Sequence, residues 1–143
     1  MTTLAQAAEL GRAEQGLAIV STVRADGTPQ STLVNAGVLP HPTSGADVLA
    51  FVTYGAVKLA NLRARPQIAV AFRSGWRFAT VEGRAELLGP KDGDIDAESL
   101  RVLLRDIFTA AGGTHDDWDE YDRVMREQGR TAVLVEPTRI YGS

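Results

Sequence analysis

The chain has 143 residues, 44% apolar and 23% charged, a composition typical of one soluble globular domain spanning residues 1–143. It contains no cysteine, which excludes disulfides, thiolate nucleophiles, cysteine-ligated zinc and iron–sulfur clusters. A formal net charge of −3 argues against a general nucleic-acid-binding protein. No apolar run reaches the ~18 residues of a membrane span, and residues 1–15 lack a signal-peptide pattern, so we expect a cytoplasmic protein without a membrane partner.

The residue pattern predicts mostly strands with a few short helices. In chain order we expect a helix at residues 4–14, strands at 17–24, 30–39 and 48–54, a helix at 57–64, strands at 68–73 and 76–88, helices at 96–111 and 115–128, and a strand at 130–141. Asp26-Gly27 is a strong hairpin signal between the first two strands. The 48–54 strand is mostly apolar, which predicts burial on both faces.

The second half of the chain carries the clearest helical signal. Apolar residues from Leu100 to Ala111 recur at helical spacing, and Thr114 is placed to cap the helix after them. Pro137 predicts an edge or a bulge in the last strand. Hairpin-connected strands followed by surface helices predict a mainly β fold: a small barrel of about six antiparallel strands with short flanking helices.

Most chemistries that a protein of this size could perform have no support in the sequence. His41 lies in a proline-rich loop and His115 at a helix start, so neither predicts a catalytic triad, and no metal-ligand spacing is present. The acidic residues at 116–122 are typical of a solvated helix start. No Walker loop and no G-x-G-x-x-G occurs. We therefore predict no metal and leave catalytic residues unassigned.

One segment does point to a ligand. In residues 53–66 a strand ends at a glycine turn and a short helix begins at once, which exposes N–H groups that attract anions. A lysine in the first helical turn is unfavourable for the helix dipole. Lys58 is therefore expected either to bind a phosphate or to point to solvent. Trp76 follows the Gly75 turn, where its side chain could cover a planar ring. The alternative interpretation is a core or dimer-contact tryptophan.

Four segments make the chain recognisable. They are residues 17–30, LAIVSTVRADGTPQ; residues 58–66, like K-x-x-N-L-R-x-x-P; residues 75–83, like G-W-x-x-x-x-x-E-G; and the closing stretch from His115 to Gly142. In this order and spacing they resemble the F420-dependent (deazaflavin-dependent) enzymes of the pyridoxamine 5′-phosphate-oxidase-like family. The resemblance implies a split β-barrel of the FMN-binding type and a homodimer with cofactor sites at the subunit interface.

The resemblance also implies which residues bind the cofactor. Lys58 would bind its phosphate-bearing tail. The other residues implied to line the site are Thr53, Tyr54 and Asn61 near the tail, Gln30, Thr32, Val34 and Asn35 beside the ring, and Trp76 and Arg130 across the dimer. Relatives often carry an arginine two residues before the lysine, where this chain has Ala56. Arg63 or Arg65 are candidates to replace that charge.

Three functions remain open from the sequence. The first is an F420-dependent oxidoreductase that transfers a hydride from the reduced deazaflavin to a conjugated small-molecule acceptor. The second keeps the fold but binds FMN, as a flavin reductase or a pyridoxamine-phosphate-oxidase-like protein. The third is a non-catalytic carrier of F420, haem or a lipid. The sequence does not name the substrate.

Overall fold

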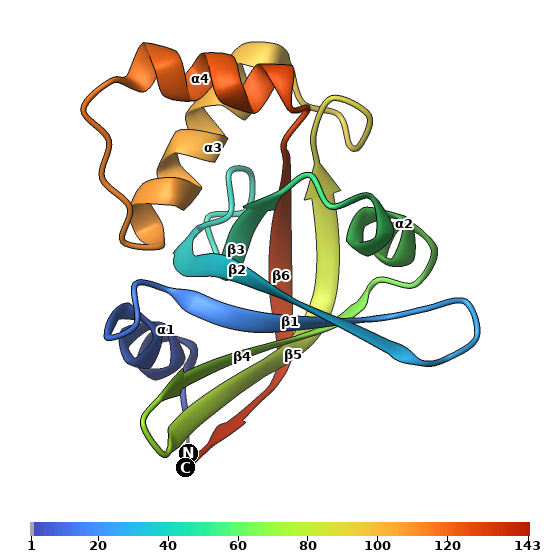
Figure 1. Cartoon of the computed structure of the whole chain (residues 1–143), viewed down its shortest axis with the longest axis vertical. Coiled ribbons are helices and arrows are strands. Elements are labelled where there is room, and N and C mark those ends of the chain that lie inside the picture. Colours follow the sequence, from blue (N-terminus) through green and yellow to red (C-terminus); the bar gives the residue numbers. More distant parts are fainter. Residues whose placement is uncertain (1) are drawn as a thin grey trace.

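The computed structural model describes residues 2–143 as a closed barrel of antiparallel strands with helices outside it (Figure 1). The strand order around the barrel is β1-β2-β3-β6-β5-β4. The elements in chain order are α1 (Leu4–Arg12), β1 (Leu17–Val23), β2 (Pro29–Pro40), β3 (Asp47–Thr53), α2 (Ala56–Ala64), β4 (Gln67–Ser74), β5 (Arg77–Leu88), α3 (Ala97–Ala110), α4 (Trp118–Glu127) and β6 (Thr131–Gly142). The predicted six-stranded antiparallel barrel is confirmed.

Two apolar clusters hold the fold together, one on each face of the barrel wall. The inner cluster fills the barrel and includes Val20, Phe51, Val70, Phe72, Val81 and Val133. The outer cluster lies beneath α3 and α4 and includes Ala50, Leu103, Leu104, Ile107, Ala132 and Leu134. β3 contributes alternate residues to both clusters, which confirms its predicted burial on both faces.

Turn and cap chemistry sets the element ends, with two differences from the sequence prediction. The first helix ends at Arg12, two residues earlier than predicted, because Gln15 and Gly16 both adopt positive φ in the turn into β1. Asp117, and not Thr114, caps α4: its carboxylate accepts a hydrogen bond from the Glu120 backbone N–H at 3.1 Å. The predicted irregularity at Pro137 is confirmed as a register shift between β5 and β6.

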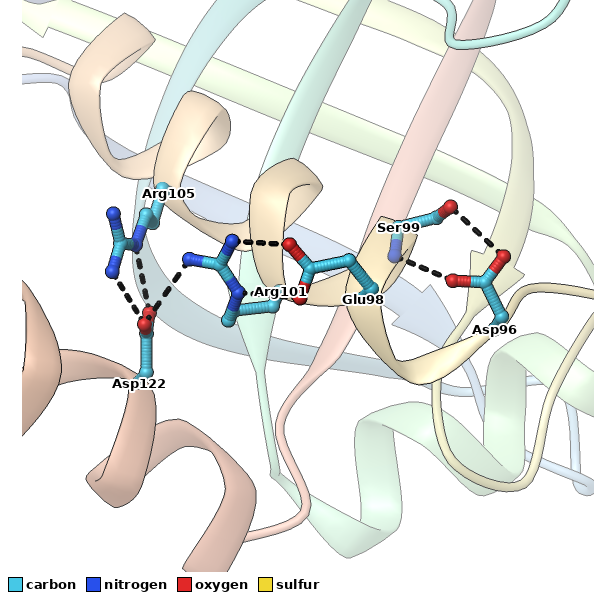
Figure 2. Close-up of polar contacts among 6 residues, drawn as sticks. All are labelled: Asp96, Glu98, Ser99, Arg101, Arg105 and Asp122. Carbon is cyan, nitrogen blue, oxygen red and sulfur yellow. Dashed lines mark hydrogen bonds and ion pairs between the residues drawn. The ribbon is translucent and has the colours of Figure 1, made fainter.

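Salt bridges and hydrogen bonds link α3 to α4 (Figure 2). Arg105 Nε donates to Asp122 Oδ1 at 2.9 Å, and Arg101 Nη1 donates to Asp122 Oδ2 at 3.3 Å. Arg101 also pairs with Glu98 one turn earlier. The Arg105 guanidinium, helped by Arg101, holds the pKa of the Asp122 carboxyl below its usual value. Asp122 of α4 therefore ties this helix to two arginines of α3.

The barrel is split on one side, because β2 changes partner along its length. Residues 36–40 of β2 pair with β3, whereas residues 29–35 leave β3 and pair only with β1. The end of β3, at Val52 and Thr53, therefore keeps β6 on one side and loses β2 on the other. We call this opening the split. Figure 1 shows the β1–β2 hairpin reaching past it toward α2.

No helix among residues 2–143 is both long and apolar enough to cross a bilayer.

Candidate functional site

The split places α2 directly opposite the inner face of the β1–β2 hairpin. β3 ends at Thr53, Gly55 starts α2 without a side-chain cap, and the first turn of α2 then faces the barrel. Asn61 of α2 and Arg65 just after it reach β1: Asn61 donates to Thr22 Oγ1 at 3.0 Å, and Arg65 Nε donates to the Val23 carbonyl at 2.8 Å. These bonds fix α2 against the β1–β2 hairpin, and we call the group of polar residues around this contact, Thr22, Gln30, Thr32, Thr53, Lys58 and Asn61, the Lys58 site.

Lys58 is the central residue of this site. Its side chain is 95% buried, since only 5% is exposed, so the interpretation that it points to solvent is wrong. The ammonium donates to Thr53 Oγ1 at 3.4 Å and lies 5.7 Å from the centre of the Phe51 ring. No carboxylate in the described part of the chain pairs with it, and burial lowers its pKa. An unpaired buried cation is costly, which points to an anionic ligand.

A short chain of side-chain hydrogen bonds runs from α2 to β2. Asn61 donates to Thr22, and the Thr22 hydroxyl donates to Gln30 Oε1 at 3.1 Å. This pairing turns the amide N–H₂ of Gln30 away from Thr22, and that group has no partner within residues 2–143. Thr22 is a site residue that the sequence analysis missed. In the structure Ala18, Val20 and Thr22 are the buried positions of β1, but residues 17–23 show no alternation of apolar and polar residues that would single out Thr22.

The predicted ring-flanking residues of β2 divide between the two faces of the strand. Gln30, Thr32 and Val34 share the inner face, opposite Thr22, Val20 and Ala18 in that order. Thr32 Oγ1 is buried, and no described residue is its hydrogen-bond partner. Asn35 points to the outer face, where its amide donates to the Gln15 carbonyl at 2.9 Å.

Tyr54 and Arg130 form a stacked pair at the outer edge of the split. The Arg130 guanidinium carbon lies 4.0 Å above the centre of the Tyr54 ring, and its Nε donates to Gln128 Oε1 at 2.8 Å. Burial lowers the pKa of Arg130. Arg63 is not available to replace the charge missing at Ala56, because both of its hydrogen bonds go to Asp92 at 2.7 Å.

Trp76 lies apart from the other predicted site residues. It occupies the β4–β5 turn after Gly75, which has φ of +61°, and its side chain is 99% exposed. The interpretation as a core tryptophan is therefore wrong, whereas a contact with a partner subunit stays a prediction. Figure 1 places this hairpin and both chain ends at the end of the barrel opposite α3 and α4.

The donor set of the Lys58 site suits an organic anion better than a metal. Among residues 2–143 no three histidine, aspartate or glutamate side chains lie close enough together to hold a metal ion. The site offers one ammonium, one unpartnered hydroxyl and one amide N–H₂, from Lys58, Thr32 and Gln30. Two of these are donors only, and together they fit a phosphate and the polar edge of a ring.

A comparison with family sequence models gives the family. The model described as pyridoxamine 5′-phosphate oxidase matches residues 4–143, nearly the whole chain. The chain belongs to the pyridoxamine 5′-phosphate oxidase family.

Solved structures of low sequence identity share this family's fold. A conserved hypothetical protein from Mycobacterium tuberculosis is 19% identical, with a TM-score of 0.71 over 99% of this chain and 84% of that one. A protein named F420 reductase is 22% identical, with a TM-score of 0.57 over 87% and 88% of the two chains. An FMN-binding protein related to pyridoxamine 5′-phosphate oxidase, from Nostoc punctiforme, is 14% identical with a TM-score of 0.59 over 99% and 86%. The split-barrel fold is therefore that of the family.

Proposed function

We propose that this protein is an oxidoreductase that uses coenzyme F420 to reduce a conjugated small molecule. The observation that carries the proposal is the buried ammonium of Lys58, which has no carboxylate partner among the described residues and lies where a strand gives way to a helix start. Similarity to a protein named F420 reductase supports the choice of cofactor.

The residues of the Lys58 site fit such a cofactor. Lys58 would bind the phosphate of the tail, and Thr53 would hold the ammonium in place through the bond that it already accepts. Thr32 and Gln30 would offer their unpartnered polar groups to the ring, and Val34 an apolar surface beside it. When bound, reduced F420 supplies a hydride from C5 of its ring to the acceptor. The protein's part is to bind, orient and shield the reactants.

We further propose that two copies of the chain form a dimer through the outer face of the sheet. Ile19 pairs with Leu33 on one side and Ala71 on the other, so the three side chains form one row on this face. Ile19 and Leu33 remain 47% and 59% exposed. A row of exposed apolar residues on a sheet is typical of an interface. Leu33→Glu should convert a dimer to a monomer in sedimentation velocity, and a wild-type monomer at micromolar concentration would overturn this step.

FMN is the second candidate cofactor. The chain has Ala56 where related F420 enzymes often carry an arginine, and a structurally similar protein is named FMN-binding. Both cofactors carry a phosphate on a ribityl chain, so Lys58 would serve either one. A titration with each cofactor therefore distinguishes the two candidates.

The test is a fluorescence titration of the purified protein with F420 and, separately, with FMN. Lys58→Ala should weaken binding by roughly 10–100-fold, the loss expected for one charge-assisted hydrogen bond of ~1.5–3 kcal/mol. Lys91→Ala is the matched control, because Lys91 is the chain's other lysine and is exposed. Binding of F420, together with oxidation of reduced F420 by enones or quinones in the presence of the protein, supports a reductase. Binding without turnover across that panel supports a carrier, and preference for FMN moves the proposal to the second cofactor.

A further inference from the structure

A cavity of about 600 Å³ lies between the α3–α4 pair and the barrel wall. Sites for small molecules commonly have volumes of ~300–1,000 Å³. Asn35 and Val52 line this cavity, and these are the residues at which β2 and β3 separate. Val52 and Thr53 are consecutive in β3 and so point to opposite faces. The cavity thus borders the split on the outer face, while Lys58 borders it on the inner face.

Aromatic and apolar side chains form the wall of the cavity toward the helices. Phe108 and Tyr121 pack against each other with ring centres 5.0 Å apart, and His115 lies 6.3 Å from Phe108. Ile107 and Met125 add apolar surface beside them. Flat apolar walls favour a flat, conjugated ligand.

Arg130 is the cationic group of this cavity. It lines the cavity, is half-buried, and forms no salt bridge with any carboxylate among residues 2–143. Nε is taken by Gln128, and the guanidinium face is taken by Tyr54, so both terminal NH₂ groups remain without an acceptor in the described chain. A guanidinium held in this way is preorganised for a carboxylate or a similar planar anion.

The other charged group of the cavity does not oppose such a ligand. Glu120 also lines the cavity, but its side chain is 55% exposed and lies 3.9 Å from the guanidinium of Arg123. A larger cavity of about 760 Å³ lies between α1 and the end of β6, lined by Gln6 and Tyr141 among others. None of the residues that line that cavity flanks the split.

We propose that the cavity beneath α3 and α4 binds the acceptor substrate, and that this substrate is a flat conjugated molecule with a carboxylate that pairs with Arg130. The proposal rests on the proposed function in one respect, because a molecule bound in this cavity is the hydride acceptor only if the protein uses the proposed cofactor. The substrate would then lie on one side of the split and the cofactor phosphate on the other. The binding site itself stands on the cavity, its aromatic wall and the free guanidinium.

The test uses a matched pair of probes, 2-naphthoate and methyl 2-naphthoate, in isothermal titration calorimetry. The two share the same flat ring system, and only the first is an anion. Wild-type protein should bind the acid at least tenfold more tightly than the ester, as expected for a charge-assisted pair. Arg130→Gln should weaken the acid to the level of the ester. Arg126→Gln, which removes an exposed arginine of α4 that does not line this cavity, should change neither affinity.

Two further variants locate the probe. Val124→Trp, which adds bulk inside the cavity, should remove binding of both probes while F420 titration is unaffected. Lys58→Ala should leave both probe affinities unchanged. The proposal is overturned if acid and ester bind alike, if Arg130→Gln leaves the acid unaffected, if Lys58→Ala abolishes probe binding, or if no heat is detected. Should F420 fail to bind while the probes behave as expected, the proposed function fails and the anion site remains.

Discussion

Replacement of Lys58 by methionine should make the cofactor-free protein more stable. The change removes one long hydrogen bond to Thr53 and a distant contact with the Phe51 ring, together worth about 1–2 kcal/mol. It also removes the desolvation of an ammonium that is 5% exposed and has no carboxylate partner in the described chain, which costs several kcal/mol. Methionine fills a similar volume. We expect a net gain of about 1–2 kcal/mol in the free energy of unfolding.

The pH dependence gives the same prediction a second signature. Burial lowers the pKa of Lys58 below its usual 10.5, so the folded protein loses this proton at a lower pH than the unfolded chain does. Between those two pKa values the unfolded state binds more protons, and wild-type stability rises with pH. The destabilisation by Lys58 is therefore complete below the folded-state pKa and is relieved as pH approaches 10.5. The advantage of Lys58→Met should shrink over that interval.

The assay is urea unfolding at neutral and alkaline pH, with thermal melts alongside. At about 3 °C per kcal/mol for a chain of 143 residues, the melting temperature should rise by ~3–6 °C. Lys91→Met is the control and should move it by less than about 1 °C, because Lys91 is exposed. Inorganic phosphate should stabilise wild type and not Lys58→Met. A variant that is no more stable than wild type would refute the view that this ammonium is held at a cost for a ligand.

Three other substitutions test the frame of the site. Tyr121→Phe removes a buried hydroxyl that donates to a main-chain carbonyl of α3 at 3.0 Å, and should cost about 1 kcal/mol in urea unfolding; an unchanged midpoint would contradict this. Asp122→Asn removes the carboxylate whose pKa is lowered by Arg105, so its deficit against wild type should be full above pH 4 and should vanish as pH falls further, in melts at graded pH. Gly37→Ala adds a Cβ that collides with the α3 backbone, and it should lower the free energy of unfolding by about 1–3 kcal/mol in the same assay. The amides of α3 should also lose protection in hydrogen exchange, and protection equal to that of wild type would refute the close approach.

Local patterns in the sequence predicted the fold well. Asp26-Gly27 and Gly75 mark the hairpin turns because glycine accepts positive φ, and α2 ends before Pro66 because proline disfavours helical geometry in the residue that precedes it. The cap of α4 was assigned to the wrong residue for a related reason. Thr114 and Asp117 are both good capping residues, and the choice depends on how the chain leaves the Gly112-Gly113 turn.

The arrangement of the site was predicted in part. The motif around Lys58 identified the Lys58 site, since Thr53 and Asn61 are held close to the lysine by the short β3–α2 connection. Strand alternation could have separated Asn35 from Thr32, because adjacent residues of a strand face opposite ways. The Tyr54–Arg130 stack joins segments far apart in sequence, so no local pattern contains it.

The position of β6 between β3 and β5 affects how the chain folds as it is made. Both neighbours of β6 are synthesised before it, and residues 89–130, which include α3 and α4, separate β5 from β6. At about 5–20 residues per second, synthesis of that stretch takes roughly 2–8 s. For that time β3 and β5 each present an unpaired edge, and α3 and α4 already exist without the strand whose outer face they cover. The barrel can therefore close only after residues 131–142 have been made, and until then the edges of β3 and β5 are open to incorrect pairing.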